Sequence, residues 1–227
     1  MIYAALSATA HELAQLPEAI NSLHPQVDRV FVFLDRPFPY ELANTAMAQV
    51  TNHDKCRYSM TEHKGDMAMF AINTLKDAGK EDTIITKDDT ILFCQPDTIY
   101  PPDYAEKIIA KYDLEQAKCV SVGGFKIDKP KTLVKSTHEG EVDIPTPNFA
   151  ISASIVKNLA PSADFIGNTE IFVALVCRQK EIPIFHVPHK KGWLKVSNTT
   201  IGADVVEFSI YEERLQHLST KLQLQPA

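Results

Sequence analysis

The chain has 227 residues, of which 44% are hydrophobic and 23% are charged, and its formal net charge at pH 7 is −6. This balance is typical of a folded globular protein and excludes disordered, collagenous and fibrous chains. Because the net charge is negative, binding to DNA, RNA or anionic lipid would need a local basic patch, for which His189-Lys190-Lys191 is the one candidate.

Short apolar runs alternate with stretches of helical spacing through the first half of the chain. This pattern predicts an α/β fold, in which crossover helices connect the strands of a parallel or mixed sheet. No Lys or Arg precedes the apolar residues 1–10, so we interpret them as a buried strand rather than a signal peptide. Strands are predicted over residues 2–7, 29–34, 55–60 and 90–94, and helices over residues 11–23, 66–75 and 101–112.

The second half is predicted to open with a strand over residues 118–122. Residues 126–147 are polar and contain three prolines. They are expected to form a long excursion, which in a compact domain often serves as a functional lid. The remaining predicted elements are an apolar segment over residues 148–155, a helix over 168–179, a strand over 182–187 and a C-terminal surface helix over 203–224.

The cysteines and the apolar runs indicate the cellular compartment in which the protein is expected. The four cysteines lie far apart and form no Cys-x-x-Cys pair, which indicates neither a zinc ribbon nor a dense disulfide framework. The longest uninterrupted apolar run, residues 171–177, is far shorter than the roughly 20 residues of a membrane-spanning helix. A cytoplasmic protein without a membrane span is therefore expected.

Asp97 stands in the most informative segment of the sequence. The predicted strand over residues 90–94 leads directly into Asp97, and a helix opened by prolines follows. Asp97 is therefore expected at the carboxyl end of a strand, where open α/β sheets bind their ligands. An aspartate at this position can equally cap the turn before the helix, so the residues alone leave both interpretations open.

Residues 99–104, Ile-Tyr-Pro-Pro-Asp-Tyr, resemble the segment that follows the metal-binding acidic motif in a group of family-2-like glycosyltransferases with the GT-A fold. The first predicted β-α-β unit, the pair Gly65-Asp66 and the segment Gly192-Trp193-Leu194-Lys195 are similar to other parts of that group, in the same order. The group has Asp-Asp-Asp where this chain has Gln95-Pro96-Asp97, so only the last carboxylate is present.

The resemblance implies a fold and an activity. The expected fold is GT-A-like, with a mixed, mostly parallel sheet flanked by helices. Residues 1–227 would form one glycosyltransferase-like domain, with a nucleotide-donor half over 1–125, an acceptor half over 126–200 and the C-terminal helix over 203–224. The expected enzyme transfers a sugar from a nucleotide-diphosphate donor, with UDP as the expected nucleotide, to an acceptor hydroxyl.

The resemblance also implies a role for individual residues. Asp97 would hold Mn²⁺ or Mg²⁺ together with His189 and the phosphates of the donor, because these hard ions prefer oxygen ligands. Asp164 is the candidate general base and Glu170 is the alternative. Asp164 can equally stabilise the N-terminus of the next helix, and His189 can equally be a solvated histidine in a basic turn.

The other candidate residues would contact the donor or the acceptor. The residues expected at the base, ribose or phosphates of the nucleotide are Ser7, Thr9, Asp35, Asp66, Lys190 and Lys191. Trp193, the only tryptophan, would stack on an acceptor sugar or fill the core. Solvated turn residues are the alternative for Asp35 and Asp66.

Compact members of the group resemble bacterial or phage enzymes that modify surface glycans or hydroxymethylated bases in DNA, so a glycan or such DNA is a possible acceptor.

Two further functions are open alternatives. Loss of two acidic positions at Gln95-Pro96 also fits a non-catalytic descendant that binds a nucleotide or a glycan. A nucleotidyltransferase would normally have a glycine-rich phosphate loop where this chain has Ser7-Ala8-Thr9-Ala10. The oligomeric state is not predicted.

Overall fold

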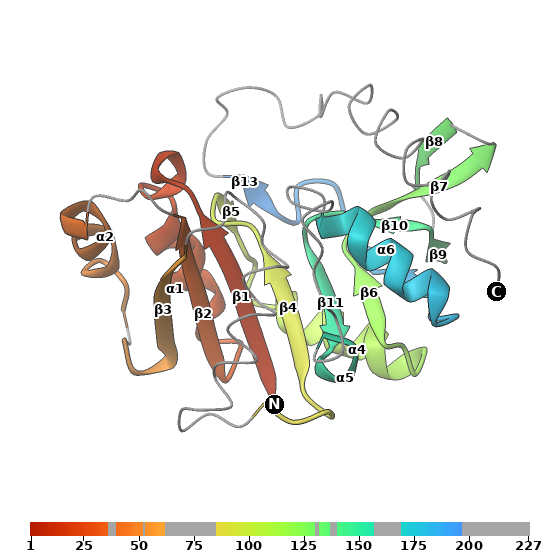
Figure 1. The fold of residues 1–227 in the computed structure, drawn as a ribbon, viewed down its shortest axis with the longest axis horizontal. Coiled ribbons are helices and arrows are strands. Elements are labelled where there is room, and N and C mark those ends of the chain that lie inside the picture. The colour runs from red at the N-terminus through yellow and green to blue at the C-terminus, as the bar shows by residue number, and fades with distance from the viewer. Residues whose placement is uncertain are drawn as a thin grey trace.

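A central sheet of eight strands organises the computed structural model, which describes residues 1–35, 40–51, 53–61, 85–129, 132–136, 140–156 and 169–196 (Figure 1). The strand order is β3-β2-β1-β4-β11-β6-β12-β9. The bounds are β1 Ile2–Ala8, β2 Arg29–Asp35, β3 Cys56–Thr61, β4 Thr90–Cys94, β6 Cys119–Ser121, β9 Glu141–Val142, β11 Phe149–Ser152 and β12 Ile184–His186.

The parallel strands of this sheet end at one common edge, which we call the carboxyl edge. Strands β3, β2, β1 and β4 are parallel, β11 runs antiparallel to both β4 and β6, and β12 is again parallel to β6. From β1 the chain proceeds to β2 and β3 on one side, whereas β4 lies on the other side. The connection after β1 and the connection into β4 therefore lie on opposite sides of β1, and we call this point the divergence between β1 and β4. At such a point α/β sheets leave a crevice for ligands, at the carboxyl ends of the two strands.

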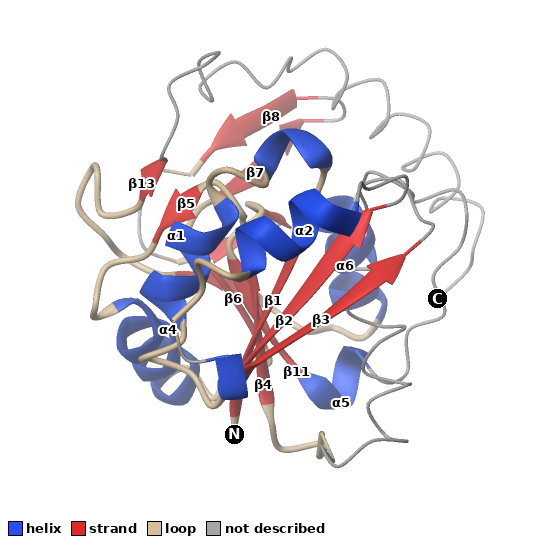
Figure 2. Cartoon of the chain, turned by 90° about the vertical axis from the view of Figure 1, so that its left-hand side faces the viewer, coloured by secondary structure: helices blue, strands red, loops and turns tan. Residues whose placement is uncertain are grey.

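Apolar side chains on both faces of the sheet form the two parts of the core. Ala4 and Leu6 of β1 face a cluster built with α1 (Leu16–Leu23), α2 (Tyr40–Met47) and α4 (Tyr104–Leu114). Tyr3 and Ala5 face the opposite cluster, built with α5 (Ala153–Val156) and α6 (Thr169–Gln179). Figure 2 shows the two sets of helices on opposite sides of the sheet. The expected fold class, a mixed and mostly parallel sheet flanked by helices, is confirmed.

The helix predicted over residues 11–23 is two elements in the structure. A 3-10 helix, η1 (Ala10–Glu12), is followed by α1, which begins at Leu16. The carboxylate of Glu12 accepts hydrogen bonds from the backbone amide and the hydroxyl of Thr9, which closes the first element as a capping box. Pro17 fits only the first turn of a helix, since it lacks an amide hydrogen. It therefore sets the start of α1.

The prediction of a long polar loop over residues 126–147 is wrong. This region contains strands β7 (Gly124–Lys129), β8 (Thr132–Lys135) and β10 (Ile144–Pro145), which form a second, antiparallel sheet in the order β10-β7-β8, as well as β9 of the central sheet. The polar side chains lie on short strands whose backbone groups pair with one another, so polarity alone did not distinguish strand from loop.

Close packing of β7 against β9 and β10 requires a glycine at position 124. A Cβ atom there would lie 2.6 Å from the Cβ of Val142 and 2.7 Å from the carbonyl oxygen of Ile144. We expect Gly124→Ala to lower the free energy of unfolding by about 1–3 kcal/mol, the usual cost of overpacking, in urea denaturation. Gly123→Ala is the control, because its Cβ would meet only the side chain of Thr146, at 3.0 Å; an equal loss in both variants would contradict this account.

Several predictions fall outside the described residues. These include the helix over 66–75 and the C-terminal helix over 203–224. The division into a donor half and an acceptor half stays a prediction. A search of the described helices finds none with the length and hydropathy needed to cross a membrane.

Candidate functional site

The polar turn between β4 and β5 (Thr98–Ile99) lies at the carboxyl edge of the sheet and carries Asp97. The Asp97 side chain is half-buried, and its Oδ1 atom accepts a hydrogen bond from the Thr98 hydroxyl at 3.3 Å. Asp97 therefore occupies the expected place beside the divergence between β1 and β4. Its binding of a metal ion stays a prediction.

Tyr100, the first tyrosine of the Tyr-Pro-Pro-Asp-Tyr segment, holds this turn in shape. Its ring is buried, with 2% of its surface exposed. The hydroxyl accepts a hydrogen bond from the Gln95 amide at 2.6 Å and donates one to Oδ1 of Asn148 at 2.7 Å, which ties the turn to the start of β11. Burial raises the pKa of Tyr100 well above its ordinary value, and so the hydroxyl remains a neutral donor.

Asp103 and Tyr104 of the same segment hold Trp193. The Trp193 indole N–H donates to Oδ1 of Asp103 at 2.9 Å, and the Tyr104 ring lies 5.7 Å from the Trp193 ring. Lys107 forms an ion pair of 2.7 Å with Asp103 and places its ammonium group 4.9 Å from the centre of the Trp193 ring. These hydrogen bonds from Lys107 and Trp193 lower the pKa of Asp103. Trp193 is thus anchored to the start of α4; its stacking on an acceptor sugar stays a prediction.

Residues 187–196, which we call the β12–β13 segment, cross the carboxyl edge of the sheet. At one end, the Val187 amide donates to the carbonyl of Ser121 at 2.8 Å. At the other end, strand β13 (Lys195–Val196) pairs with β5, directly after the Asp97 turn (Figure 1). In between, a tight turn brings the Trp193 amide to the carbonyl of Lys190 at 3.1 Å, with Gly192 at φ 76°, a conformation that favours glycine.

The structure distinguishes the two histidines near this segment. His186 is 6% exposed, and its Nε2–H donates to the carbonyl of Val122 at 2.9 Å. His189 is exposed, and its Nδ1–H donates to the carbonyl of Val187 at 2.9 Å. Because a carbonyl only accepts, the neutral ring of His189 carries its lone pair on Nε2. Of the two, His189 is therefore the residue that a ligand can reach, and its binding of a metal ion stays a prediction.

The remaining predicted nucleotide contacts are less well defined. Ser7 and Thr9 lie at the carboxyl end of β1, where Thr9 takes part in the capping box with Glu12. Asp35 ends β2 at the same edge, but its side chain is outside the described residues, as is all of Asp66. Their contacts with a nucleotide stay predictions.

The structure describes only one of the two candidate bases, Glu170. Glu170 is half-buried in the first turn of α6, which begins toward the carboxyl edge (Figure 1). Asp164 lies outside the described residues.

The described residues offer a poor set of metal ligands. Across the described ranges, no three His, Cys, Asp or Glu side chains gather into a group able to hold a metal ion. In the turn after β4, Gln95 and Pro96 supply no carboxylate beside Asp97. Mn²⁺ or Mg²⁺ stays a prediction, and the described donor set does not fit such an ion.

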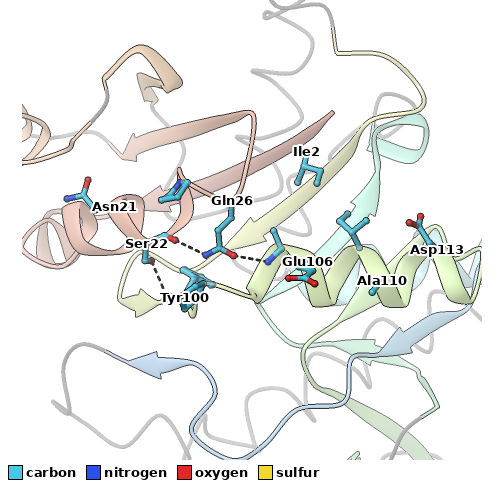
Figure 3. A pocket seen from close by; sticks show the side chains of 12 residues that line it. Ile2, Asn21, Ser22, Gln26, Tyr100, Glu106, Ala110 and Asp113 are labelled. Carbon is cyan, nitrogen blue, oxygen red and sulfur yellow. Dashed lines mark hydrogen bonds between the residues drawn. The ribbon is translucent and has the colours of Figure 1, made fainter.

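A groove of about 810 Å³ lies away from this edge, between α1 and α4 (Figure 3). Its central polar group, Gln26, donates to the carbonyls of Ser22 and Pro101, both at 2.8 Å, and accepts from the Ala105 amide at 3.0 Å. These side-chain bonds hold α1 against α4. The polar group in the groove therefore has a structural role that needs no ligand.

Comparison with family models gives no match for this chain, and comparison with curated proteins gives none either. Solved structures do match. A 4-diphosphocytidyl-2C-methyl-D-erythritol synthase aligns with 94% of this chain and 97% of its own, at a TM-score of 0.56 and 12% identity. Residues 1–349 of S. aureus TarS in complex with UDP align with 83% of this chain at a TM-score of 0.57 and 12% identity.

These similarities concern the fold. The chain spans 58% of the TarS structure that contains UDP, and 39% of a longer TarS structure, which aligns at a TM-score of 0.61 and 11% identity. Together with the strand order, they identify the fold as GT-A-like.

Proposed function

We propose that this protein transfers a sugar from a nucleotide-diphosphate donor, with UDP as the nucleotide, to an acceptor hydroxyl. The observation that carries the proposal is the anchored turn with Asp97 at the carboxyl end of β4, beside the divergence of β1 and β4 and bordered by the β12–β13 segment. The TarS structure with UDP supports this choice of nucleotide, since it has the same fold.

The reaction has two requirements that these residues address. The bond between the sugar and the diphosphate breaks, so the negative charge that develops on the leaving diphosphate must be stabilised. Lys190 and Lys191 are exposed cations at this edge. The acceptor hydroxyl must also lose its proton as its oxygen attacks the sugar. Asp164 is the proposed base for that proton and Glu170 is the alternative.

A second candidate is nucleotidyl transfer, in which a sugar phosphate or related phosphate attacks a nucleoside triphosphate and pyrophosphate leaves. The observation in its favour is the alignment of the synthase structure over almost the whole of both chains. The absence of a glycine-rich segment at residues 7–10 counts against it. A non-catalytic nucleotide-binding protein is the remaining alternative.

The test is release of UDP from a panel of UDP-sugars, offered with glycan acceptors and with DNA that contains hydroxymethylated bases, with and without Mn²⁺. We expect acceptor-dependent release of UDP. If this release depends on Mn²⁺, Asp97→Asn should reduce it at least tenfold, because the carboxylate that would hold the ion is lost. Asp88→Asn is the matched control, since it removes an exposed carboxylate just before β4, at the opposite edge of the sheet.

Other outcomes would point to other functions. Release of pyrophosphate from CTP or UTP in the presence of a sugar phosphate, with no turnover of UDP-sugars, would favour the nucleotidyltransferase. UDP binding without any turnover, unchanged in Asp97→Asn, would favour the non-catalytic alternative.

A further inference from the structure

The β12–β13 segment concentrates positive charge in an acidic protein. It contains three lysines, Lys190, Lys191 and Lys195, and no acidic residue. All three side chains are exposed. In the part of the chain that the structure describes, none of the three lysines forms an ion pair. Three lysines elsewhere do form ion pairs with carboxylates: Lys107 with Asp103, Lys111 with Glu115 and Lys126 with Asp143.

The backbone that carries these cations is fixed. Val187 is hydrogen-bonded to β6, the turn at Gly192 is closed by a backbone hydrogen bond, and β13 is paired with β5. The Trp193 side chain adds the indole bond to Asp103, which directly precedes α4 and lies 90 residues earlier in the chain. A backbone held before the ligand arrives loses less conformational entropy on binding, which favours affinity.

On the other side of the site, the described residues do not supply the charges that a bound cation needs. Asp97 is the one carboxylate in the turn after β4, and its Oδ1 already accepts the Thr98 hydroxyl. The backbone N–H of Gln95 donates to the Tyr100 hydroxyl and, as a donor, cannot ligate a cation. Among the described residues, the turn after β4 supplies one carboxylate and the β12–β13 segment beside it supplies three lysines, an arrangement that suits an anion better than a divalent metal ion.

We propose that the β12–β13 segment binds the diphosphate of the donor through Lys190 and Lys191, so that a nucleoside diphosphate binds without a divalent cation. This inference rests on the proposed function. Lysine ammonium groups donate charge-assisted hydrogen bonds to phosphate oxygens, and these are stronger than bonds between neutral groups. The same contacts strengthen as the diphosphate leaves and gains charge, and they then take the part that a metal ion plays in other diphosphate sites.

The experiment is calorimetric titration of UDP into the full chain in EDTA. We expect the native chain to bind UDP in EDTA and the double variant Lys190→Gln/Lys191→Gln to bind it at least about tenfold more weakly. Binding of uridine, which has no phosphate, should change less than twofold. The control Lys87→Gln/Lys118→Gln removes two exposed lysines at the opposite edge, before β4 and β6, and should bind UDP within twofold of native.

Each of the other outcomes overturns the inference. If native protein binds UDP only after Mn²⁺ is added, the proposed function stands and the inference fails. The inference also fails if the Lys190→Gln/Lys191→Gln variant, folded by circular dichroism, binds UDP in EDTA as tightly as native. If UDP does not bind with or without Mn²⁺, the proposed function fails together with the inference.

Discussion

Replacing Tyr104 with alanine is expected to lower the free energy of unfolding by about 3–5 kcal/mol, the range for removal of a large buried ring. The side chain is fully buried, with 0% of its surface exposed. Its ring lies 4.6 Å from that of Tyr100 and 5.7 Å from that of Trp193, so it supports both the Asp97 turn and the β12–β13 segment. Urea denaturation measures the loss, and fluorescence of the only tryptophan reports the local packing.

Tyr104→Phe is the control for this prediction. It keeps the ring and removes a hydroxyl that accepts a weak hydrogen bond from the Cys94 thiol at 4.0 Å. We expect a loss of at most about 1 kcal/mol, typical of one weak hydrogen bond. A small loss for Tyr104→Ala, with unchanged Trp193 fluorescence, would contradict the role of Tyr104 as the common support of the site.

In a working transferase, Asp164→Asn is expected to lower kcat by about 10²–10⁴-fold, the usual contribution of a general base. The amide cannot accept the proton of the acceptor hydroxyl but has almost the same size as the carboxylate. UDP binding should be unchanged, because the base acts on the acceptor. The measurement is kcat and KM for the acceptor, with UDP affinity from calorimetry.

Glu170→Gln separates the two candidate bases. We expect it to reduce kcat much less than Asp164→Asn does. The reverse order would assign the proton transfer to Glu170, in the first turn of α6. If neither variant lowers kcat more than the Asp88→Asn control, both assignments are wrong.

The central strands were predictable because a short, continuous apolar run indicates a buried strand without knowledge of the strands that pair with it. β1, β2 and β4 are short apolar runs buried on both faces, and each lies within one residue of its predicted bounds. The polar strands β7 and β8 were not predictable in the same way. They are stabilised by pairing with each other and with β10, which depends on partners that their own sequence does not reveal.

The same distinction applies to the site. The position of Asp97 follows from its place directly after a buried strand, a local property of the sequence. The bond between Trp193 and Asp103 joins residues 90 positions apart, and no spacing rule identifies such a pair. The signal was nevertheless present, since the resemblance covered both the Tyr-Pro-Pro-Asp-Tyr segment and Gly192-Trp193. For Trp193 it suggested an acceptor sugar or a place in the core, and the structure adds a hydrogen bond to Asp103 that was not predicted.

A crystal structure of the chain with UDP would test most directly whether the carboxyl edge is a donor site. We expect the nucleotide to lie across the carboxyl ends of β1 and β4, with its diphosphate within hydrogen-bond distance of the β12–β13 segment. UDP bound elsewhere, for example in the groove between α1 and α4, would contradict the proposed site. Crystals that contain no nucleotide at saturating UDP, with this edge open to solvent, would contradict the proposed function.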